Sequence, residues 1–321
     1  MGGKGEAYTP DEVAALLKIS KYTVYELIKR GDLSAFRVGN KVRVEPEALE
    51  AFKLKMKTDL PQPAVFADQK RGQAFRSSAM TEGVLRLAGS HDFIIEQLTR
   101  YVNKNEPSLL LQFSSIGSLE GLMMLYRGVT DMAAIHLYDP STKEYNLPLI
   151  KRLFIYEPIT VIRLAERIQG FIVAKNNPLK ITSWEDLTRK DIVFVNRQKG
   201  SGTRFLLDCH LIERGIDPQE IKGYEHEEWS HIDTAALIAQ GKADVTLGIE
   251  AAARKLGLSF IPVTRECFDL VLYWRDTNRQ MLARFCDVLS SEPFKASLSH
   301  LQGYHFDALG QIVFDNRLKR G

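Results

Sequence analysis

The sequence of 321 residues predicts a small, mostly helical N-terminal domain followed by a larger α/β domain built in two lobes. Three observations predict this fold class. The chain is too long for one ordinary core and suits two or three domains. Apolar residues recur at helical spacing from about residue 8 to residue 57. From Val84 onward, short apolar strands alternate with helical segments, which is typical of an α/β domain with largely parallel strands.

The domain boundaries follow from the same patterns. We expect the first domain over residues 1–57, a linker over residues 58–83, and the α/β domain over residues 84–321. The linker segment contains two prolines and polar residues with little periodicity. The strand candidates in the α/β domain are VLRLAG, SLLLQFS, DMAAIHL, GFIVAK, DIVFVN, ADVTLGI, LSFIPV and FDLVLYW.

Composition limits the classes of protein that fit. The chain is 45% hydrophobic and 26% charged, which is the balance of a soluble globular protein, and its net charge of +3 requires any basic surface to be local. The three cysteines lack CxxC spacing, so we expect structural thiols rather than a metal site or a disulfide framework. An apolar leader or membrane span is also missing from the pattern, which predicts a cytoplasmic protein.

The N-terminal helices begin at recognisable caps. Thr9 is the expected N-cap of the first helix, with Pro10 at the first helical position and Glu12 completing a capping box. Ser20 caps a second helix that ends at Gly31. Two helices joined by a tight turn, with a polar and basic second helix, are typical of a helix-turn-helix.

A basic hairpin and a third helix follow. Apolar and basic residues alternate from residue 36 to residue 44 around Gly39 and Asn40, which predicts a β-hairpin with a two-residue turn. Such a hairpin after a helix-turn-helix is a wing. Pro46 and Glu47 then open a helix that runs to about Lys57.

Positive charge is concentrated in this region. Residues 18–43 hold seven basic and two acidic residues, a local net charge of +5 that exceeds the net charge of the whole chain. Contact with the phosphates of double-stranded DNA requires such a concentration. The predicted DNA-binding residues are Lys21, Tyr22, Thr23, Tyr25, Lys29, Arg30, Arg37, Lys41 and Arg43.

The segment YTPDEVAALLKISKYTVYELIKRGDLSAFRVGNKVRVEPEALEAF, from Tyr8 to Phe52, resembles the excisionase-type winged helix domain. The resemblance implies a DNA-binding domain with the order helix, turn, helix, hairpin, helix. A winged helix used only for protein contacts is the alternative.

Loops of small residues lie between strands and helices in the α/β domain. They occur at Ser90, at residues 114–118, near His136, at residues 199–204 and at residues 248–250. The first turn of a helix offers unpaired N–H groups and partial positive charge, and Gly and Ser let an anion approach them. Several such helix starts meeting between two lobes predict an oxyanion pocket, whereas each one singly is ordinary capping.

The order of strands and helices also predicts the lobes. The first lobe is expected over residues 84–165 and again over 266–321, and the second over residues 166–265. The connecting stretches near residues 163–169 and 264–267 are then hinges.

From Val84 to about Gln311 the chain resembles the type II periplasmic-binding-protein fold, and more specifically the molybdate/tungstate-binding domains that are fused to helix-turn-helix domains. The resemblance is carried by LAGSHD, SSIGSLEGLMMLYRGVTDMAAIHLYD, QGFIVAKNNPLKITSWEDL, NRQKGSGTR and GKADVTLGIEAAAR. It implies a tetrahedral oxyanion held by hydroxyl and backbone N–H groups, without a cofactor or a protein-bound metal cation. The resemblance implicates Ser90, Ser115, Ser118, Ser201, Gly202 and Thr203.

Three charged or titratable residues complete the predicted ligand site. His91 and His136 either donate to the ligand or are structural groups. Arg204 either pairs with the anion or lies on the helix surface.

Three functions are compatible with these patterns. The leading hypothesis is a transcription regulator, acting as a homodimer on paired half-sites, whose DNA affinity changes when molybdate or tungstate closes the lobes. The second is the same architecture sensing a small organic anion, for which Trp229, Tyr273 and Trp274 would supply an apolar wall. The third is an enzyme, which we do not expect: Ser90, His91 and Asp92 are neighbours at a helix start and cannot form a triad, and KGSGTR lacks the Walker ending.

Overall fold

The computed structural model describes residues 7–17, 24, 28, 33–38, 41–50, 52 and 83–317. The chain divides into two units, Met1–Arg76 and Ser77–Gly321. The linker predicted over residues 58–83 lies outside the described residues, except for Gly83. In the described part of the chain, no helix has the length and apolar character needed to cross a membrane.

The first unit begins with the predicted capped helix. Helix α1 (Pro10–Leu17) starts at Thr9, whose backbone N–H donates to the Glu12 carboxylate at 2.7 Å, while the Glu12 N–H donates to Thr9 Oγ1 at 3.3 Å. These two bonds form a capping box, so the predicted helix start is confirmed. Of the predicted second helix, only Val24 and Ile28 lie among the described residues.

The predicted hairpin is also confirmed. Strands β1 (Phe36–Val38) and β2 (Lys41–Arg43) pair antiparallel, with Val38 opposite Lys41, so two residues connect them. Residues 46–50 are helical, as expected after Pro46. The core of this unit contains Val13, Ala14, Val24, Leu33, Val44, Leu49 and Phe52.

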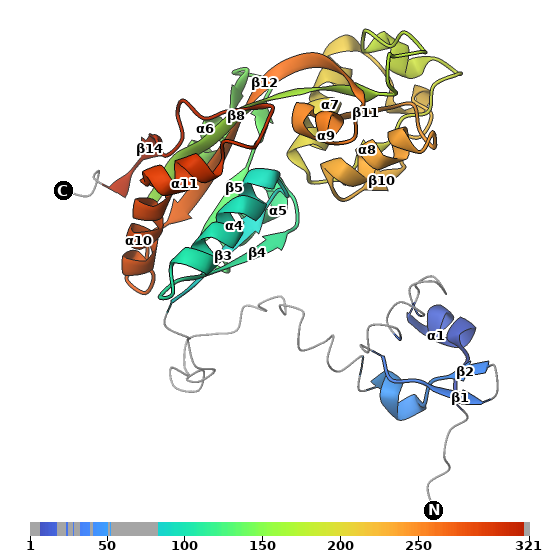
Figure 1. Ribbon diagram of the computed structural model, residues 1–321, viewed down its shortest axis with the longest axis horizontal. Coiled ribbons are helices and arrows are strands. Elements are labelled where there is room, and N and C mark those ends of the chain that lie inside the picture. Colours follow the sequence, from blue (N-terminus) through green and yellow to red (C-terminus); the bar gives the residue numbers. More distant parts are fainter. Residues whose placement is uncertain are drawn as a thin grey trace, which may run out of the picture. The chain divides into compact units, whose positions relative to one another are not determined.

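The second unit is built on one mixed sheet with the order β11-β8-β12-β5-β3-β4 (Figure 1). Strands β3 (Val84–Gly89), β4 (Leu110–Ser115) and β5 (Met132–Ile135) are parallel to one another. Helix α4 (Phe93–Asn105) connects β3 to β4, and α5 (Ser118–Tyr126) connects β4 to β5. These elements form lobe 1 together with α6 (Leu147–Leu153), α10 (Arg279–Ser290) and α11 (Glu292–Ser297).

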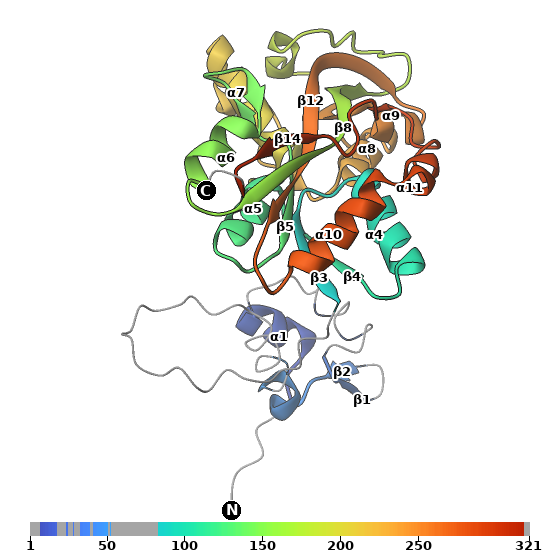
Figure 2. The same cartoon turned by 90° about the vertical axis from the view of Figure 1, so that its left-hand side faces the viewer.

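Two long strands pass through both lobes (Figures 1 and 2). Strands β8 (Ile159–Val173) and β12 (Ser259–Tyr273) pair antiparallel along their whole length, so the predicted hinge residues lie in the middle of both strands. Strands β13 (Tyr304–His305) and β14 (Ile312–Asp315) pair with β8. The expectation of largely parallel strands is therefore wrong for β8 and β12, which pair antiparallel with their neighbours. LSFIPV and FDLVLYW, which we predicted as two strands, belong to one strand.

Lobe 2 contains the rest of the chain between β8 and β12. Strand β11 (Val245–Ile249) pairs antiparallel with β8, and β9 (Asn196–Arg197) pairs with β10 (Glu227–Glu228). Helices α7 (Gly202–Arg214), α8 (His231–Ala239) and α9 (Glu250–Lys255) complete this lobe. Of the predicted strand DIVFVN, only the end forms a strand. A short pair of strands, β6 (Tyr138–Asp139) and β7 (Glu144–Tyr145), follows β5.

The sheet of lobe 1 is buried on both faces, because alternate side chains of a strand point to opposite faces. Met132 and Ala134 of β5 pack into the cluster that α4, α10 and α11 cover. Ala133 and Ile135 pack into the cluster that α5 and α6 cover. Lobe 2 has a separate core around Phe171, Phe194 and Leu247.

The three cysteines are free thiols, as the sequence predicts. Cys209 is buried, whereas Cys267 and Cys286 are half-buried. Burial raises the pKa of each thiol to about 11, so all three are protonated and poorly nucleophilic at neutral pH.

Gly89 is a position where the fold requires glycine. Its φ is +142°, and a Cβ atom there would lie 2.1 Å from the carbonyl oxygen of Ala134. We predict that Gly89→Ala lowers the free energy of unfolding by about 3 kcal/mol or more, since backbone must move to relieve the clash. Denaturant titration of the full chain measures this change.

Gly215→Ala is the matched control. Gly215 ends α7 with a φ of +65°, and a Cβ there would meet nothing within 4 Å. Its cost should be about 1 kcal/mol from the left-handed backbone alone. Equal effects of the two substitutions would contradict the proposed close packing between β3 and β5.

Candidate functional site

The two lobes meet where loops after strands of one lobe approach a helix start of the other. The Leu119 N–H of α5 donates to the Gly200 carbonyl at 3.2 Å. A Cβ at Gly202, the first residue of α7, would lie 2.4 Å from the carbonyl oxygen of His136. Only a residue without a side chain lets the start of α7 approach lobe 1 this closely.

On the lobe 1 side, two hydroxyls and an imidazole form a buried cluster. Ser90 follows β3, Ser118 opens α5 and His136 follows β5. The Ser90 and Ser118 Oγ atoms are 2.8 Å apart, and His136 Nε2 is 3.1 Å from Ser90 Oγ. The His136 backbone N–H donates to Ser118 Oγ at 3.1 Å. Three loops that are distant in sequence thus bring their polar groups to one point.

Glu266 of β12 sets the direction of these hydrogen bonds. Its carboxylate is 2.9 Å from His136 Nδ1. Burial acts to raise the pKa of Glu266, but Arg167 and His136 outweigh this and lower it to about 2, so the carboxylate is ionised. It therefore accepts from His136 Nδ1–H, and Nε2 of the neutral imidazole accepts from Ser90.

Protonation of His136 changes the pattern. In the neutral cluster, the Ser90 hydroxyl donates to His136 and the Ser118 hydroxyl donates to Ser90, so neither hydrogen is free. When Nε2 is protonated it becomes a donor, and the Ser90 hydroxyl hydrogen is released for a ligand. Burial lowers the pKa of His136, although Glu266 acts to raise it, so the neutral form prevails at pH 7.

Arg167 of β8 lies at the centre of a buried ion network. Its side chain is 0% exposed, and it pairs with Asp92, the N-cap of α4, and with Glu266. The Tyr304 hydroxyl is 3.0 Å from both oxygens of Asp92. Burial opposes the charge on Arg167, but the two carboxylates outweigh it and raise its pKa. The network connects α4, β8, β12 and β13.

Gln169, two residues further along β8, connects the network to lobe 2. Its Nε2 donates to Thr203 Oγ1 in α7 at 2.9 Å and to the Glu266 carboxylate at 3.1 Å. Gln169 Oε1 and Arg167 Nη2 are buried without a hydrogen-bond partner among the described residues.

Arg197 is also buried, and its surroundings differ from those of Arg167. Arg197 is 2% exposed. Its Nε donates to the Gln198 side chain at 3.1 Å, and its Nη2 donates to the Trp229 carbonyl at 3.0 Å. Within residues 83–317, no carboxylate lies within ion-pair distance of it. Burial and the charge of Arg167 lower the pKa of Arg197 to about 10, so it is still charged at pH 7.

His231, the first residue of α8, adds further unpaired donors and acceptors. It is buried, and neither ring nitrogen has a hydrogen-bond partner in the described chain. Burial lowers the pKa of His231 well below its ordinary value, and the charges of Arg197 and Arg167 lower it further. A buried cation without an ion pair and a buried imidazole without a hydrogen bond are costly, and an anion would satisfy both.

Comparison with known families identifies both parts of the chain. Residues 99–290 match the family described as PBP superfamily domain, and residues 7–57 match the family described as helix-turn-helix domain. The first match covers more than half of the chain. The chain belongs to the PBP superfamily domain family.

Individual relatives agree with this assignment. The chain is 37% identical over 313 residues to the uncharacterized protein YvgK of Bacillus subtilis (strain 168), covering 96% of this chain and 98% of that protein. Over 46 residues it is 48% identical to the putative DNA-binding protein MT0521 of Mycobacterium tuberculosis (strain CDC 1551 / Oshkosh), covering 14% of this chain and 59% of that protein.

A solved structure shows the same fold as the PBP superfamily domain. It is a putative phosphate ABC transporter substrate-binding protein from Clostridium perfringens with bound phosphate. The TM-score is 0.52 at 17% identity, covering 70% of this chain and 99% of that chain. The predicted fold class, a helix-turn-helix domain followed by a two-lobed α/β binding domain, is confirmed. This is the architecture of a ligand-responsive DNA-binding regulator, and both families resemble binding and regulatory proteins rather than enzymes.

The structure brings together five of the residues predicted to bind the ligand in this PBP superfamily domain. Four others lie elsewhere or are already engaged. Ser201 caps α7 by accepting from the Arg204 N–H at 3.2 Å, His91 is 2.7 Å from the Glu96 carboxylate, and Ser115 is exposed at the end of β4. The five residues that cluster are Ser90, Ser118, His136, Gly202 and Thr203.

Arg204 is held within lobe 2. It pairs with Asp208 at 3.0 Å and with Glu227 at 3.1 Å, and its guanidinium lies 4.0 Å from the Tyr224 ring centroid. Asp208 is one turn away on the same helix, which is the spacing at which helical side chains meet. These contacts leave Arg197, rather than Arg204, as the buried arginine without a carboxylate.

The aromatic wall that an organic ligand would need is not assembled from the three predicted residues. Trp274 is buried at the end of β12, where its Nε1 donates to Thr160 at 2.8 Å, and Tyr273 adjoins it in lobe 1. The Trp229 side chain is 63% exposed in lobe 2.

Most of the predicted DNA-binding residues lie outside the described part of the chain. These are Lys21, Tyr22, Thr23, Tyr25, Lys29 and Arg30. Arg37 is in β1 and Lys41 and Arg43 are in β2, so the wing carries three of the predicted basic residues.

Arg167 and Arg197 should respond oppositely to substitution. Arg167→Met leaves Asp92 and Glu266 buried without a cation, and we predict that it lowers the free energy of unfolding by about 3–5 kcal/mol. Arg197→Met removes a buried charge that forms no ion pair within residues 83–317, so we expect an unchanged or higher stability, by up to about 2 kcal/mol. Denaturant titration without added anions measures both, and a larger loss in Arg197→Met would contradict the assignment of Arg197 to ligand binding.

Proposed function

We propose that this protein is a DNA-binding regulator whose DNA affinity changes when a small oxyanion binds between the two lobes, with Arg197 as its principal charge partner. Molybdate and tungstate are the anions we favour. One observation carries the proposal: Arg197 is buried and charged, yet no carboxylate in residues 83–317 pairs with it. A buried charge without an ion pair lowers the stability of the fold, and a bound ligand of opposite charge restores it.

Polar groups around Arg197 support an anion rather than an apolar ligand. Arg197 acts electrostatically on His136 and His231, so these groups belong to one charged region. Unpartnered donors in that region come from Arg167 on β8 and from the imidazole of His231. The Ser90 hydroxyl adds a neutral donor from lobe 1 once His136 is protonated, and charged and neutral donors together are the kind of set that a tetrahedral dianion accepts from.

The proposed response is a change in the arrangement of the lobes. Hydrogen bonds at the lobe junction include Leu119 to Gly200 and Gln169 of β8 to Thr203. A ligand that bonds to both lobes shifts the balance between their arrangements. By linkage, DNA then changes the affinity for the anion by the same factor. A homodimer on paired half-sites and a cytoplasmic location are parts of this proposal.

Calorimetric titration tests the ligand. We expect the full chain to bind molybdate or tungstate, and Arg197→Met to weaken binding at least about thirtyfold, because loss of one partner in a buried charge pair costs about 2 kcal/mol or more. Arg189→Met is the matched control, since Arg189 lies on the surface of lobe 2 beside Asp186 and Asp191. Phosphate, sulfate and small carboxylates complete the panel.

The outcomes of this titration separate the alternatives. Binding of a carboxylate but of no inorganic anion would favour the organic-anion alternative. Equal affinities of the wild type, Arg197→Met and Arg189→Met for an anion would contradict the site.

Anion binding should depend on pH. His136 and His231 are neutral when the site is empty, because burial lowers the pKa of both. A bound anion favours the imidazolium, so the complex holds more protons than the free protein and affinity rises as pH falls from about 8 to about 6. Titration in two buffers of different ionisation enthalpy counts the protons taken up. Release of protons on binding would contradict this account.

Salt dependence tests the DNA half of the proposal. Arg37→Ala or Lys41→Ala in the wing should weaken binding to a duplex from the protein's own promoter and lower the slope of log affinity against log salt by about 1 each. Fluorescence anisotropy at several salt concentrations measures the slope. The control is Lys242→Ala, on the surface of lobe 2, which should leave the slope unchanged; a wild-type slope in both wing variants would contradict a role for the wing.

A further inference from the structure

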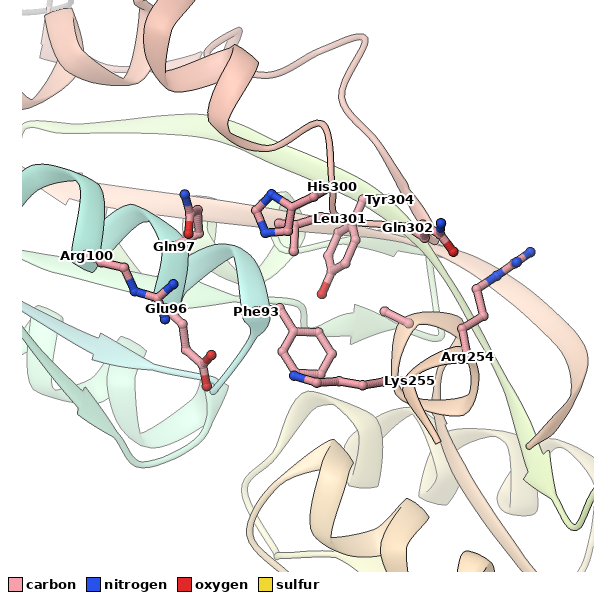
Figure 3. A pocket seen from close by; sticks show the side chains of 11 residues that line it. Phe93, Glu96, Gln97, Arg100, Arg254, Lys255, His300, Leu301, Gln302 and Tyr304 are labelled. Atoms are coloured by element: carbon pink, nitrogen blue, oxygen red, sulfur yellow. The ribbon is translucent and has the colours of Figure 1, made fainter. Parts of the chain in front are cut away.

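A cavity lies between the lobes, and Arg197 is not among the residues that line it. Its volume is about 340 Å³, within the range of small-molecule pockets. Figure 3 shows its walls: α4 of lobe 1, α9 of lobe 2, and the segment at residues 300–304 that follows α11. Residues from both lobes line one space, so an occupant contacts both.

The floor of this cavity is a contact between the lobes. The Lys255 ammonium of α9 lies 4.6 Å from the centroid of the Phe93 ring of α4, which is a cation–π contact. Figure 3 shows the Lys255 side chain directly beside the Phe93 ring, with Tyr304 on the opposite wall. Two aromatic rings and a cation thus face the same space.

The charge of the cavity is positive. Glu96, which lines the cavity, has its carboxylate 2.7 Å from His91 Nε2. The Arg254 guanidinium is paired with Glu250 at 2.6 Å. Arg100 and Lys255 have no carboxylate within ion-pair distance among the described residues. Two cations that line the cavity are therefore available to an anionic group, and the His300 ring adds a further polar group.

We propose that this cavity binds an organic anion that carries a planar ring, as a site separate from the oxyanion site at Arg197. The ring packs against Phe93 and Tyr304, and the anionic group pairs with Lys255 and Arg100. The Tyr304 hydroxyl is bonded to Asp92, so Tyr304 offers its ring to the ligand.

The same bond connects the two sites. Asp92 accepts from Tyr304 at one side of the cavity and pairs with Arg167 in the network at the lobe junction. An occupant that bridges α4 and α9 favours the arrangement in which the lobes are together. The cavity is therefore a second place at which a small molecule acts on lobe closure.

Dye titration of the full chain tests the proposal. The probe is 1-anilinonaphthalene-8-sulfonate, a ring system with one anionic group, and its neutral analogue is N-phenyl-1-naphthylamine. We expect the sulfonate to bind the wild type with a rise in fluorescence, and the neutral analogue to bind at least about tenfold more weakly, since it lacks the charge that Lys255 and Arg100 require.

Variants locate the dye. Arg100→Met/Lys255→Met should weaken binding of the sulfonate at least about tenfold, whereas the control Arg279→Met/Lys242→Met, with two cations removed from elsewhere on the surface, should stay within about twofold of the wild type. Thermal melting verifies that the variants are folded. If the double variant does not fold, Lys255→Met alone and the neutral analogue decide the question.

Three results would overturn the proposal: no binding of the sulfonate by the wild type, equal binding by the Arg100→Met/Lys255→Met variant, or equal binding of the neutral analogue. Displacement of the dye by saturating molybdate with 1:1 competition would place the dye at the oxyanion site and would also overturn it. A chain that binds the dye as expected but binds no inorganic anion would leave this cavity supported while the oxyanion proposal fails.

Discussion

The pairing of Arg167 with Asp92 and Glu266 is the interaction on which the rest of the ligand-binding domain depends. Arg167 is fully buried where β8 passes from one lobe to the other, so its charge is tolerable only because two carboxylates meet it. Asp92 is thereby fixed at the start of α4, and Glu266 is fixed in β12. Glu266 in turn orients His136, and His136 orients Ser90. One buried cation thus positions the lobe 1 half of the proposed site.

Arg197 is a contrast to Arg167 at similar burial. Both guanidinium groups are buried, but the carboxylates of Asp92 and Glu266 pair with Arg167. Arg197 donates instead to neutral acceptors within the described chain. Structural arginines and ligand-binding arginines are distinguished here by their partners rather than by their exposure. The same contrast explains why Arg204, which is buried with Asp208 and Glu227 beside it, is an ion-paired structural group.

The sequence predicted those features that depend on local patterns. The capping box at Thr9, the hairpin at Gly39 and strand β3 follow from residue type and spacing alone. The part of β8 before Gly170 was missed because its charged residues, among them Arg167, break the apolar pattern, and only the tertiary network makes the burial of Arg167 possible. For the same reason, the pattern of small-residue loops after strands found Ser90 and His136 but not Arg197. That Arg197 lacks a carboxylate partner is a property of the folded chain.

In the proposed regulator, anion binding at Arg197 is coupled to DNA binding. The most direct test of this coupling is the dissociation constant for a promoter duplex, measured by fluorescence anisotropy with and without the oxyanion that the chain binds, for the wild type and for Arg197→Met. We predict a change of about 5- to 150-fold in the wild type, the usual range of coupling between two sites, and no change in Arg197→Met. The same DNA affinity in the wild type with the site empty and saturated would contradict the claim.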